Sequence, residues 1–207
     1  MIITHHGCQF FKVSFGSVTL AFNPISKASK MDTSKFGADL VLVSLWHPDF
    51  NGVSEVTHGS KKPFVISTPG EFEVGDVTAR GWSTPVIYHK QSYFNNIFQV
   101  RLEDMNIVFL GALNNPEIDP KILSELEDID ILFIPIGGGE VLEAPQAAKL
   151  ALKLEAKLVI PMHCDDAALK AFQKETGSEA VKPVTKLTIK KREVSQMTGE
   201  VVAFKTE

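Results

Sequence analysis

The sequence predicts an α/β fold in which two mixed β-sheets pack together with helices outside them. The first half of the chain reads as short strands separated by turn residues, and the second half alternates strands with helices, an order that suits two packed sheets flanked by helices. The chain has 207 residues, of which 44% are hydrophobic, so it can bury a sizeable core. No Pro/Gly/Ser-rich linker interrupts it, and we therefore expect residues 1–207 to form a single domain.

The expected strands of the first half end at glycine, proline or acidic residues. Residues 10–15 and 17–22 flank Gly16 and predict a hairpin, which Asn23-Pro24 ends. Residues 38–44 are almost all apolar, which is typical of a strand buried on both faces. The other strands of this half are expected at residues 63–67, 71–74, 77–80, 97–102 and 106–110.

In the second half the apolar residues change to a helical period. Residues 144–154 carry Ala147, Leu150, Ala151 and Leu154 on one face, and Pro145 suits the first turn of a helix. Further helices are expected at residues 120–126 and 166–175, and strands at residues 129–136, 157–161, 184–189 and 200–204.

Charge and composition exclude several classes of partner. The net charge is −4 and the chain lacks a basic footprint, so we expect no nucleic-acid partner; the basic run at residues 186–192 is more simply a solvated strand face. No apolar run approaches the ~20 residues that span a bilayer, and the N-terminus does not resemble a signal peptide. We expect a cytoplasmic protein without a membrane partner, whose Cys8 and Cys164 are free thiols.

The residues that carry chemistry lie just beyond buried strands. His47 and Asp49 follow the strand at 38–44, and His163 follows the strand at 157–161. Loops at strand ends are where sites form in layered α/β folds, so these side chains are expected in one cavity. By themselves they favour a hydrogen-bonded trio over a metal site, because a ligand set needs supporting partners.

Seven blocks along the chain resemble the metallo-β-lactamase superfamily, in the branch of small stand-alone proteins similar to the ascorbate-phosphate lactonases. They lie at residues 4–11, 21–24, 38–44, 67–74, 109–112, 134–138 and 159–163, in the order and spacing of that family. The resemblance implies a four-layer αββα sandwich, zinc-dependent hydrolysis and, in many members, an oligomer. We therefore expect a homo-oligomer and a small-molecule ligand.

The family's metal motif, H-x-H-x-D-H, is incomplete here. Its four ligand positions hold Leu45, His47, Asp49 and Phe50, its metal-bridging Asp corresponds to Ala112, and its late His is kept as His163. The His expected after the segment at 77–82 is missing, and His89 is close but out of register. Cys8 stands where the family has His, and Asn23 where it has Asp.

Counting ligands predicts a degenerate site without a cofactor. By the resemblance, His47 belongs to one metal site and Asp49 with His163 to the other, so neither reaches the three protein ligands that catalytic zinc needs. Leu45 and Phe50 would also make the pocket apolar, which disfavours an ion. The first hypothesis is therefore a non-catalytic relative that keeps the fold.

A second hypothesis keeps the enzyme. His47, Asp49 and His163 with Cys8 or Cys164 could hold one zinc or other divalent ion, with Asp49 then catalytic, in a hydrolase of a small ester, lactone or phosphodiester. Alternatively, Glu71 or Glu73, which follow Pro69-Gly70, is expected to reach the cavity.

Two further expectations stay open at this stage. Trp46 and Phe50 either form an exposed patch for a partner or pack into the emptied pocket with Leu45 and Ala112. A nucleic-acid-processing role is the weakest alternative, because the chain is acidic and has no room for an inserted domain.

Overall fold

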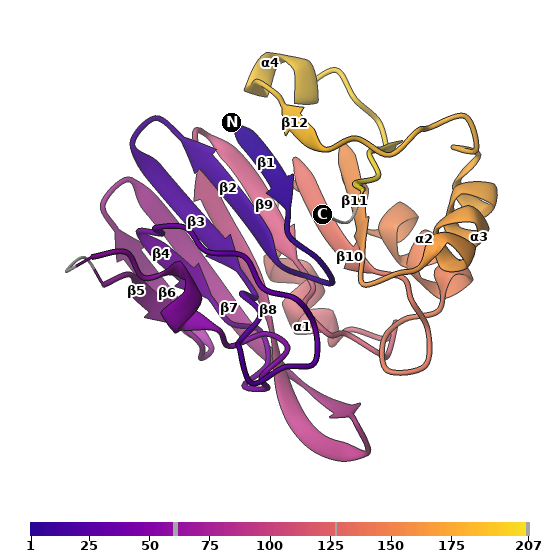
Figure 1. Cartoon of the computed structure of the whole chain (residues 1–207). Coiled ribbons are helices and arrows are strands. Elements are labelled where there is room, and N and C mark those ends of the chain that lie inside the picture. Colours follow the sequence, from indigo (N-terminus) through magenta and orange to yellow (C-terminus); the bar gives the residue numbers. More distant parts are fainter. Residues whose placement is uncertain (60–61, 127, 206–207) are drawn as a thin grey trace.

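Two mixed sheets packed face to face form the body of the molecule, with α-helices outside them (Figure 1). This computed structural model describes residues 1–59, 62–126 and 128–205. The prediction of an α/β fold with two mixed sheets and external helices is confirmed.

The first sheet has six strands within the described part of the chain. Its order is β12 (Lys186–Thr188), β1 (Ile2–His5), β2 (Phe11–Phe15), β3 (Val18–Phe22), β4 (Leu40–Leu42) and β5 (Phe64–Ile66). The first four strands pair antiparallel, and β3, β4 and β5 pair parallel. Strand β1 was not predicted, because four residues that include Thr4 and His5 show no clear alternation of apolar side chains.

The second sheet has seven strands within those same residues. Its order is β13 (Glu200–Val201), β11 (Leu158–Met162), β10 (Ile131–Pro135), β9 (Met105–Phe109), β8 (Gln91–Leu102), β7 (Val77–Tyr88) and β6 (Gly70–Val74). The strands from β13 to β9 run parallel, as expected for the half of the chain that alternates strands and helices.

Strands β7 and β8 are much longer than the sequence predicted. They pair from Thr78–Arg101 as far as Tyr88–Gln91, whereas β9 pairs only with Phe98 to Leu102 of β8. The distal half of the two strands therefore forms a two-stranded ribbon that extends beyond its neighbours (Figure 1). We call residues 82–97 the ribbon.

The core lies between the sheets and is rich in phenylalanine. Phe22 of β3 stacks on Phe109 of β9 at 5.0 Å between ring centroids, and Phe11 of β2 meets Phe133 of β10 edge-on at 4.7 Å. All four rings are completely buried. Each such ring contributes roughly 1.5–3 kcal/mol through burial, so this layer holds the strand ends that carry the site in fixed positions.

The helices cover the outer face of the second sheet. Helix α2 (Ala144–Lys153) turns Ala147, Leu150 and Ala151 toward that sheet, and α3 (Asp166–Thr176) packs beside it. The remaining helices are short: α1 (Pro120–Glu125), α4 (Lys191–Val194) and the 3₁₀ helix η1 (Val53–Val56). Within the described residues, no helix is both long enough and apolar enough to cross a membrane.

Candidate metal centre

A tight turn in the loop after β4 determines which of its side chains are buried and which are exposed. The backbone N–H of His47 donates to Leu45 O, and that of Phe50 donates to His47 O. This turn directs Leu45 and Phe50 into the interior, where both are fully buried, and leaves Trp46 62% exposed. His47 is half-buried and Asp49 is buried to 9% exposure, so both lie at the boundary between core and solvent.

The ribbon brings His89 to the same place. Its strands are joined by the two-residue turn His89-Lys90, whose φ angles of 47° and 63° are those of a type I′ turn. By sequence His89 is out of register with the family's motif, and the structure nevertheless brings it beside His47 and Asp49 through this turn. The sequence offered no Asn-Gly pair to mark this turn, and therefore no sign that the strands continue to it.

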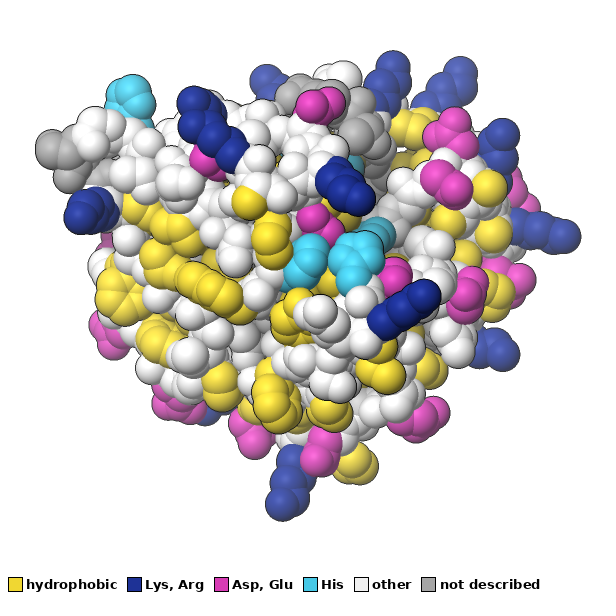
Figure 2. Space-filling view, turned by 60° about the horizontal axis from the view of Figure 1, so that its bottom comes forward, with side chains coloured by type: hydrophobic (Ala, Val, Ile, Leu, Met, Phe, Trp, Pro, Cys, Tyr) yellow, Lys and Arg dark blue, Asp and Glu magenta, His cyan; other side chains and the backbone are white. Residues whose placement is uncertain are grey.

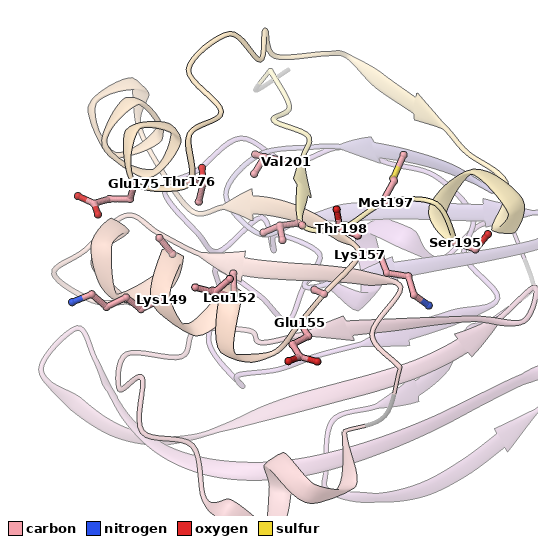
Figure 3. A pocket seen from close by; sticks show the side chains of 15 residues that line it. Lys149, Leu152, Glu155, Lys157, Glu175, Thr176, Ser195, Met197, Thr198 and Val201 are labelled. Atoms are coloured by element: carbon pink, nitrogen blue, oxygen red, sulfur yellow. The ribbon is translucent and has the colours of Figure 1, made fainter.

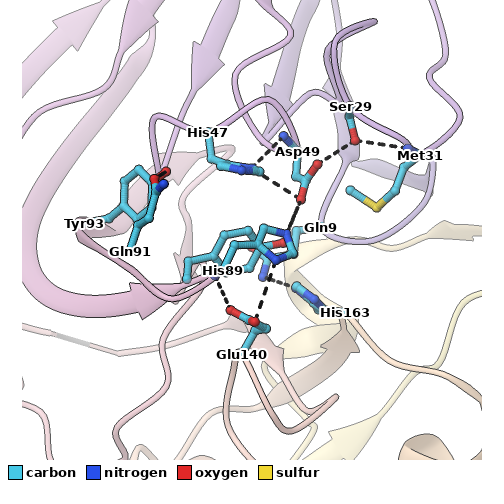
Figure 4. A network of polar contacts seen from close by, with 11 residues as sticks. Gln9, Ser29, Met31, His47, Asp49, His89, Gln91, Tyr93, Glu140 and His163 are labelled. Carbon is cyan, nitrogen blue, oxygen red and sulfur yellow. Dashed lines mark hydrogen bonds and ion pairs between the residues drawn. The ribbon is translucent and has the colours of Figure 1, made fainter.

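Three possible ligands converge on one point. His47 Nδ1 and His89 Nε2 each lie 3.4 Å from Asp49 Oδ2, and the ligand atoms of all three residues lie within 4.8 Å of one another (Figure 4). A tetrahedral ion with bonds of about 2.0–2.1 Å separates its ligand atoms by roughly 3.4 Å. Two of the three separations therefore match those around one small divalent cation, and the third residue pair is close by.

His47 Nδ1 is unprotonated, as a metal-ligating nitrogen must be. The backbone N–H of Asp49 donates to it at 3.2 Å, so its single lone pair accepts this hydrogen bond in the metal-free protein. A cation bound at this nitrogen would replace that hydrogen bond.

Asp49 is held as a carboxylate by several donors. Ser29 Oγ donates to Oδ1 at 2.6 Å, and the buried Tyr88 hydroxyl donates to Oδ2 at 2.9 Å. Burial alone would raise the pKa of Asp49, but these two hydrogen bonds and the nearby His47 and His89 lower it below its ordinary value. Asp49 is therefore ionised at neutral pH, as a metal ligand must be.

Glu140 supports His89 from the other side. His89 Nδ1 lies 3.7 Å from Glu140 Oε1, and the backbone N–H of His89 donates to Glu140 Oε2. A carboxylate behind a ligating imidazole is the usual way to orient the ring toward a metal. Glu140 follows β10 in the glycine-rich turn, where a side chain at Gly137 would lie 2.1 Å from the carbonyl oxygen of His163.

His163 lies outside the group of three. Its Nδ1 contacts Gln9 Nε2 at 2.9 Å, and its ring lies 6.2 Å from that of Phe50 and 6.3 Å from that of Tyr88. Burial lowers the pKa of His163 to about 4, so the ring is neutral at pH 7. Its role as a ligand stays a prediction, as does that of the two cysteines.

The thiols of Cys8 and Cys164 are protonated in the metal-free protein. Neither belongs to the group of ligands found among the described residues. Burial raises the pKa of each thiol to about 12, and a thiolate rather than a thiol binds zinc.

The apolar replacements pack together beside the site. Leu45, Phe50 and Ala112 form one buried cluster with Val86 and Val141. The expectation that Glu71 reaches the cavity is corrected: Glu71 lies on β6, is 74% exposed at its side chain, and pairs with Arg80 across the strand at 2.7 Å.

The site opens on the face where the ribbon meets the sheet edge. Figure 2 shows histidine side chains side by side there, with acidic side chains next to them. The rings of His47 and His89 are 5.2 Å apart. The ligand group is therefore reachable from solvent, with His89 itself exposed.

A separate cavity of about 890 Å³ lies beside α2 and the end of α3, with the segment from Ser195 to Val201 along its far side (Figure 3). Its lining contains lysines, glutamates and apolar side chains but no histidine or cysteine. It is not a metal site of the kind formed by His47, Asp49 and His89.

The comparisons with known proteins identify the family of the chain. Residues 2–163 match the model of the β-lactamase superfamily domain. A UPF0173 metal-dependent hydrolase of Natranaerobius thermophilus is 25% identical over 210 residues, covering 84% of this chain and 91% of that protein.

Solved structures share the fold over the whole chain. A Thermotoga maritima protein of the metallo-β-lactamase superfamily matches with a TM-score of 0.79 and 24% identity, covering 100% of this chain and 99% of the other. A protein from Parabacteroides distasonis matches with a TM-score of 0.67 and 16% identity, covering 98% and 93%. The chain belongs to the metallo-β-lactamase superfamily.

Proposed function

We propose that this protein is a hydrolase that uses a single divalent metal ion, held by His47, Asp49 and His89. The observation that carries the proposal is the convergence of these three ligand atoms within 4.8 Å, with both histidines 3.4 Å from the Asp49 carboxylate, the separation that a tetrahedral ion gives its ligands. The names of relatives such as the Natranaerobius metal-dependent hydrolase support it.

The residues of the chain have distinct parts in this proposal. Asp49 and the two histidines would hold the ion, Tyr88 and Ser29 orient the carboxylate, and Glu140 orients His89. A divalent ion with an open position lowers the pKa of bound water and polarises a carbonyl or phosphoryl oxygen. The substrate we propose is a small ester, lactone or phosphodiester.

The apolar cluster is the reason for proposing one metal ion rather than two. Leu45, Phe50 and Ala112 occupy three ligand positions of the family's two-metal motif, and all three are completely buried. A second cation there would have to be desolvated without compensating ligands.

The same cluster favours a second candidate, a non-catalytic relative. If the apolar packing of Leu45 and Phe50 has replaced catalysis, the three remaining polar residues serve only as a hydrogen-bonded group around Asp49. The two candidates differ in whether the purified protein retains a metal.

Metal analysis after dialysis tests the proposal. We expect one zinc, manganese or iron ion per chain in the native protein, and loss of that ion in His47→Ala and His89→Ala. His58→Ala is the matched control, because His58 is an exposed imidazole outside the ligand group. Hydrolysis of a nitrophenyl ester and of bis(nitrophenyl) phosphate should fall with the metal content.

Three outcomes separate the candidates. Protein that retains no ion, and gains none on incubation with zinc, supports the non-catalytic relative and contradicts the proposal. Two ions per chain would also contradict it. An ion that remains in His89→Ala as firmly as in the native protein would show that the ligands are misassigned.

A further inference from the structure

A buried relay of polar side chains runs from the end of β4 to His163. It consists of Ser44, Asn23 and Gln9, all 0% exposed. The contacts are Ser44 N to Asn23 Oδ1 at 2.7 Å, Asn23 Nδ2 to Gln9 Oε1 at 2.9 Å, and Gln9 Nε2 to His163 Nδ1 at 2.9 Å. Buried polar groups of this kind are satisfied by one another rather than by bulk water.

The direction of every hydrogen bond in the relay is set by its first member. A backbone N–H can only donate, so the side-chain atom of Asn23 that meets Ser44 N must be the oxygen. The amide nitrogen of Asn23 then faces Gln9 and donates, which turns the oxygen of Gln9 toward Asn23. The amide nitrogen of Gln9 is left to donate to His163 Nδ1.

The relay therefore determines the tautomer of His163. Since Nδ1 accepts a hydrogen bond, it carries no proton, and the proton of the neutral ring is on Nε2. Nε2 has no hydrogen-bond partner among the described residues, and solvent reaches it. The rings of Phe50 and Tyr88 and the charges of Asp49 and Glu140 lie near the His163 ring, which places it beside the ligand group.

We propose that His163 is held as the Nε2–H tautomer and serves the site as a hydrogen-bond donor to an oxygen of the substrate, not as a metal ligand. This inference rests on the proposed function for its substrate, but the tautomer itself belongs to the protein alone. A ring nitrogen that bears a proton has no lone pair for a metal. The ligand class it suits is a carbonyl or phosphoryl oxygen, which can accept from Nε2–H.

The neutral state of the ring agrees with this assignment. Burial lowers the pKa of His163 to about 4. At neutral pH the ring therefore carries a single proton, and the hydrogen bonds of the relay keep that proton on Nε2.

Nitrogen NMR of the histidine side chains in the metal-free protein tests the tautomer. In the native chain we expect His163 to show an unprotonated Nδ1 and a protonated Nε2. Addition of zinc should perturb the ring nitrogens of His47 and His89 strongly and leave the His163 pattern in place.

Asn23→Asp should invert the relay. A carboxylate only accepts, so it still receives the N–H of Ser44, but its second oxygen now requires Gln9 to present its amide nitrogen. The oxygen of Gln9 would then face His163, whose proton must move to Nδ1. Nε2 would gain a lone pair, and zinc affinity should rise by about tenfold or more, the scale on which such supporting partners act.

Two further variants make the result decisive. Gln9→Glu places an acceptor directly opposite Nδ1 and should also move the proton of His163 to Nδ1. This variant provides the test if Asn23→Asp does not fold. Ser44→Ala is the matched control, because it removes the Oγ contact with Asn23 at 2.7 Å but keeps the backbone N–H that directs the relay; its tautomer should stay native.

The inference is overturned if His163 of the native protein carries its proton on Nδ1, or if zinc shifts its Nε2 as it shifts that of a ligand. It is also overturned if both Asn23→Asp and Gln9→Glu keep the native pattern. Because the first measurement uses metal-free protein, a chain that binds no zinc would defeat the proposed function and leave the tautomer assignment intact.

Discussion

Asp49 is the residue on which the proposed site depends most. It receives hydrogen bonds from Ser29 and Tyr88 and lies 3.4 Å from both His47 and His89. Each donor stabilises the carboxylate form, and together they offset the cost of its burial. Asp49 therefore contributes to stability as well as to the proposed metal binding.

Tyr88→Phe removes one of these donors without changing the volume of the side chain. We expect the free energy of unfolding to fall by about 1.5 kcal/mol, since a hydrogen bond to a charged group is worth more than a neutral one. Urea denaturation measures it. Tyr93→Phe is the control: its hydroxyl donates to Gln91 on the surface, and its loss should cost less than about 0.5 kcal/mol. Equal losses in the two variants would contradict the assignment.

The sequence predicted part of this site because two of its residues share one loop. His47 and Asp49 follow a recognisable buried strand, so their proximity could be expected from spacing alone. His89 comes from another sheet, and only the strand pairing of the ribbon brings it there. Glu140 and Gln9 were not predicted as partners either, because a carboxylate or amide gives no local sign of the side chain it will orient.

Among the elements, the ribbon does most to build the site. Val86 and Tyr88 face the interior while Ile87 between them is 61% exposed, so the ribbon keeps strand alternation up to its turn. The turn itself places His89 and Lys90 in left-handed conformations. Such residues persist where the surrounding structure requires them, and they occur often at functional sites.

Lys90→Gly should relieve this strain. The left-handed conformation costs a residue with a side chain roughly 1–2 kcal/mol, and glycine loses about 0.5–1 kcal/mol of backbone entropy, so a net gain of about 0.5–1 kcal/mol is expected. Thermal unfolding at fixed metal content measures it. Lys90→Ala, which keeps the strained conformation but loses the charge, should change little. A gain in the alanine variant of the same size would show that charge, not backbone strain, is responsible.

The elements most readily predicted from the sequence were those with a continuous apolar run or a helical period. Strands β10 and β11 and helix α2 fall within one or two residues of expectation. The ribbon beyond Gly81 was missed, because Ser83, Thr84 and Pro85 interrupt the apolar pattern and Pro85 argues against a central strand. Among the described residues Pro85 lies where β7 pairs with β8 and with no further strand, and this position accommodates the proline.

At the scale of the whole molecule, Asp130 forms ion pairs and a hydrogen bond with segments that are distant in the sequence. Its carboxylate is fully buried and contacts Lys157 at 2.8 Å and Lys191 of α4 at 2.6 Å, and it accepts from the backbone N–H of Asn106 at 2.9 Å. Burial alone would raise the pKa of Asp130, but these three partners hold it below its ordinary value. The stability it contributes is present above the unfolded-state pKa, about 3.9, and is lost as pH falls through the folded-state pKa.

Asp130→Asn should therefore be destabilising in a pH-dependent way. At pH 7 we expect a loss of about 2–3 kcal/mol, less than for a fully desolvated pair because Lys191 keeps contact with water. Urea denaturation as a function of pH measures the difference between native and variant protein. The difference should be constant from pH 7 to about pH 5 and shrink below about pH 4. A difference that does not change with pH would show that the contribution is not ionic.

The two-stranded geometry of residues 82–97 also makes the proposed chemistry sensitive to length. Opposite faces of a strand alternate at every residue, so deleting one residue from the β7 arm, before Ile87, would exchange the inward Tyr88 with the outward Ile87 and carry the neighbouring imidazole away from its partners. The deletion or insertion of a single codon that encodes none of the ligands could thus remove or restore the third ligand during evolution. A comparison of the residues at the ligand positions alone would then not show which relatives still bind an ion.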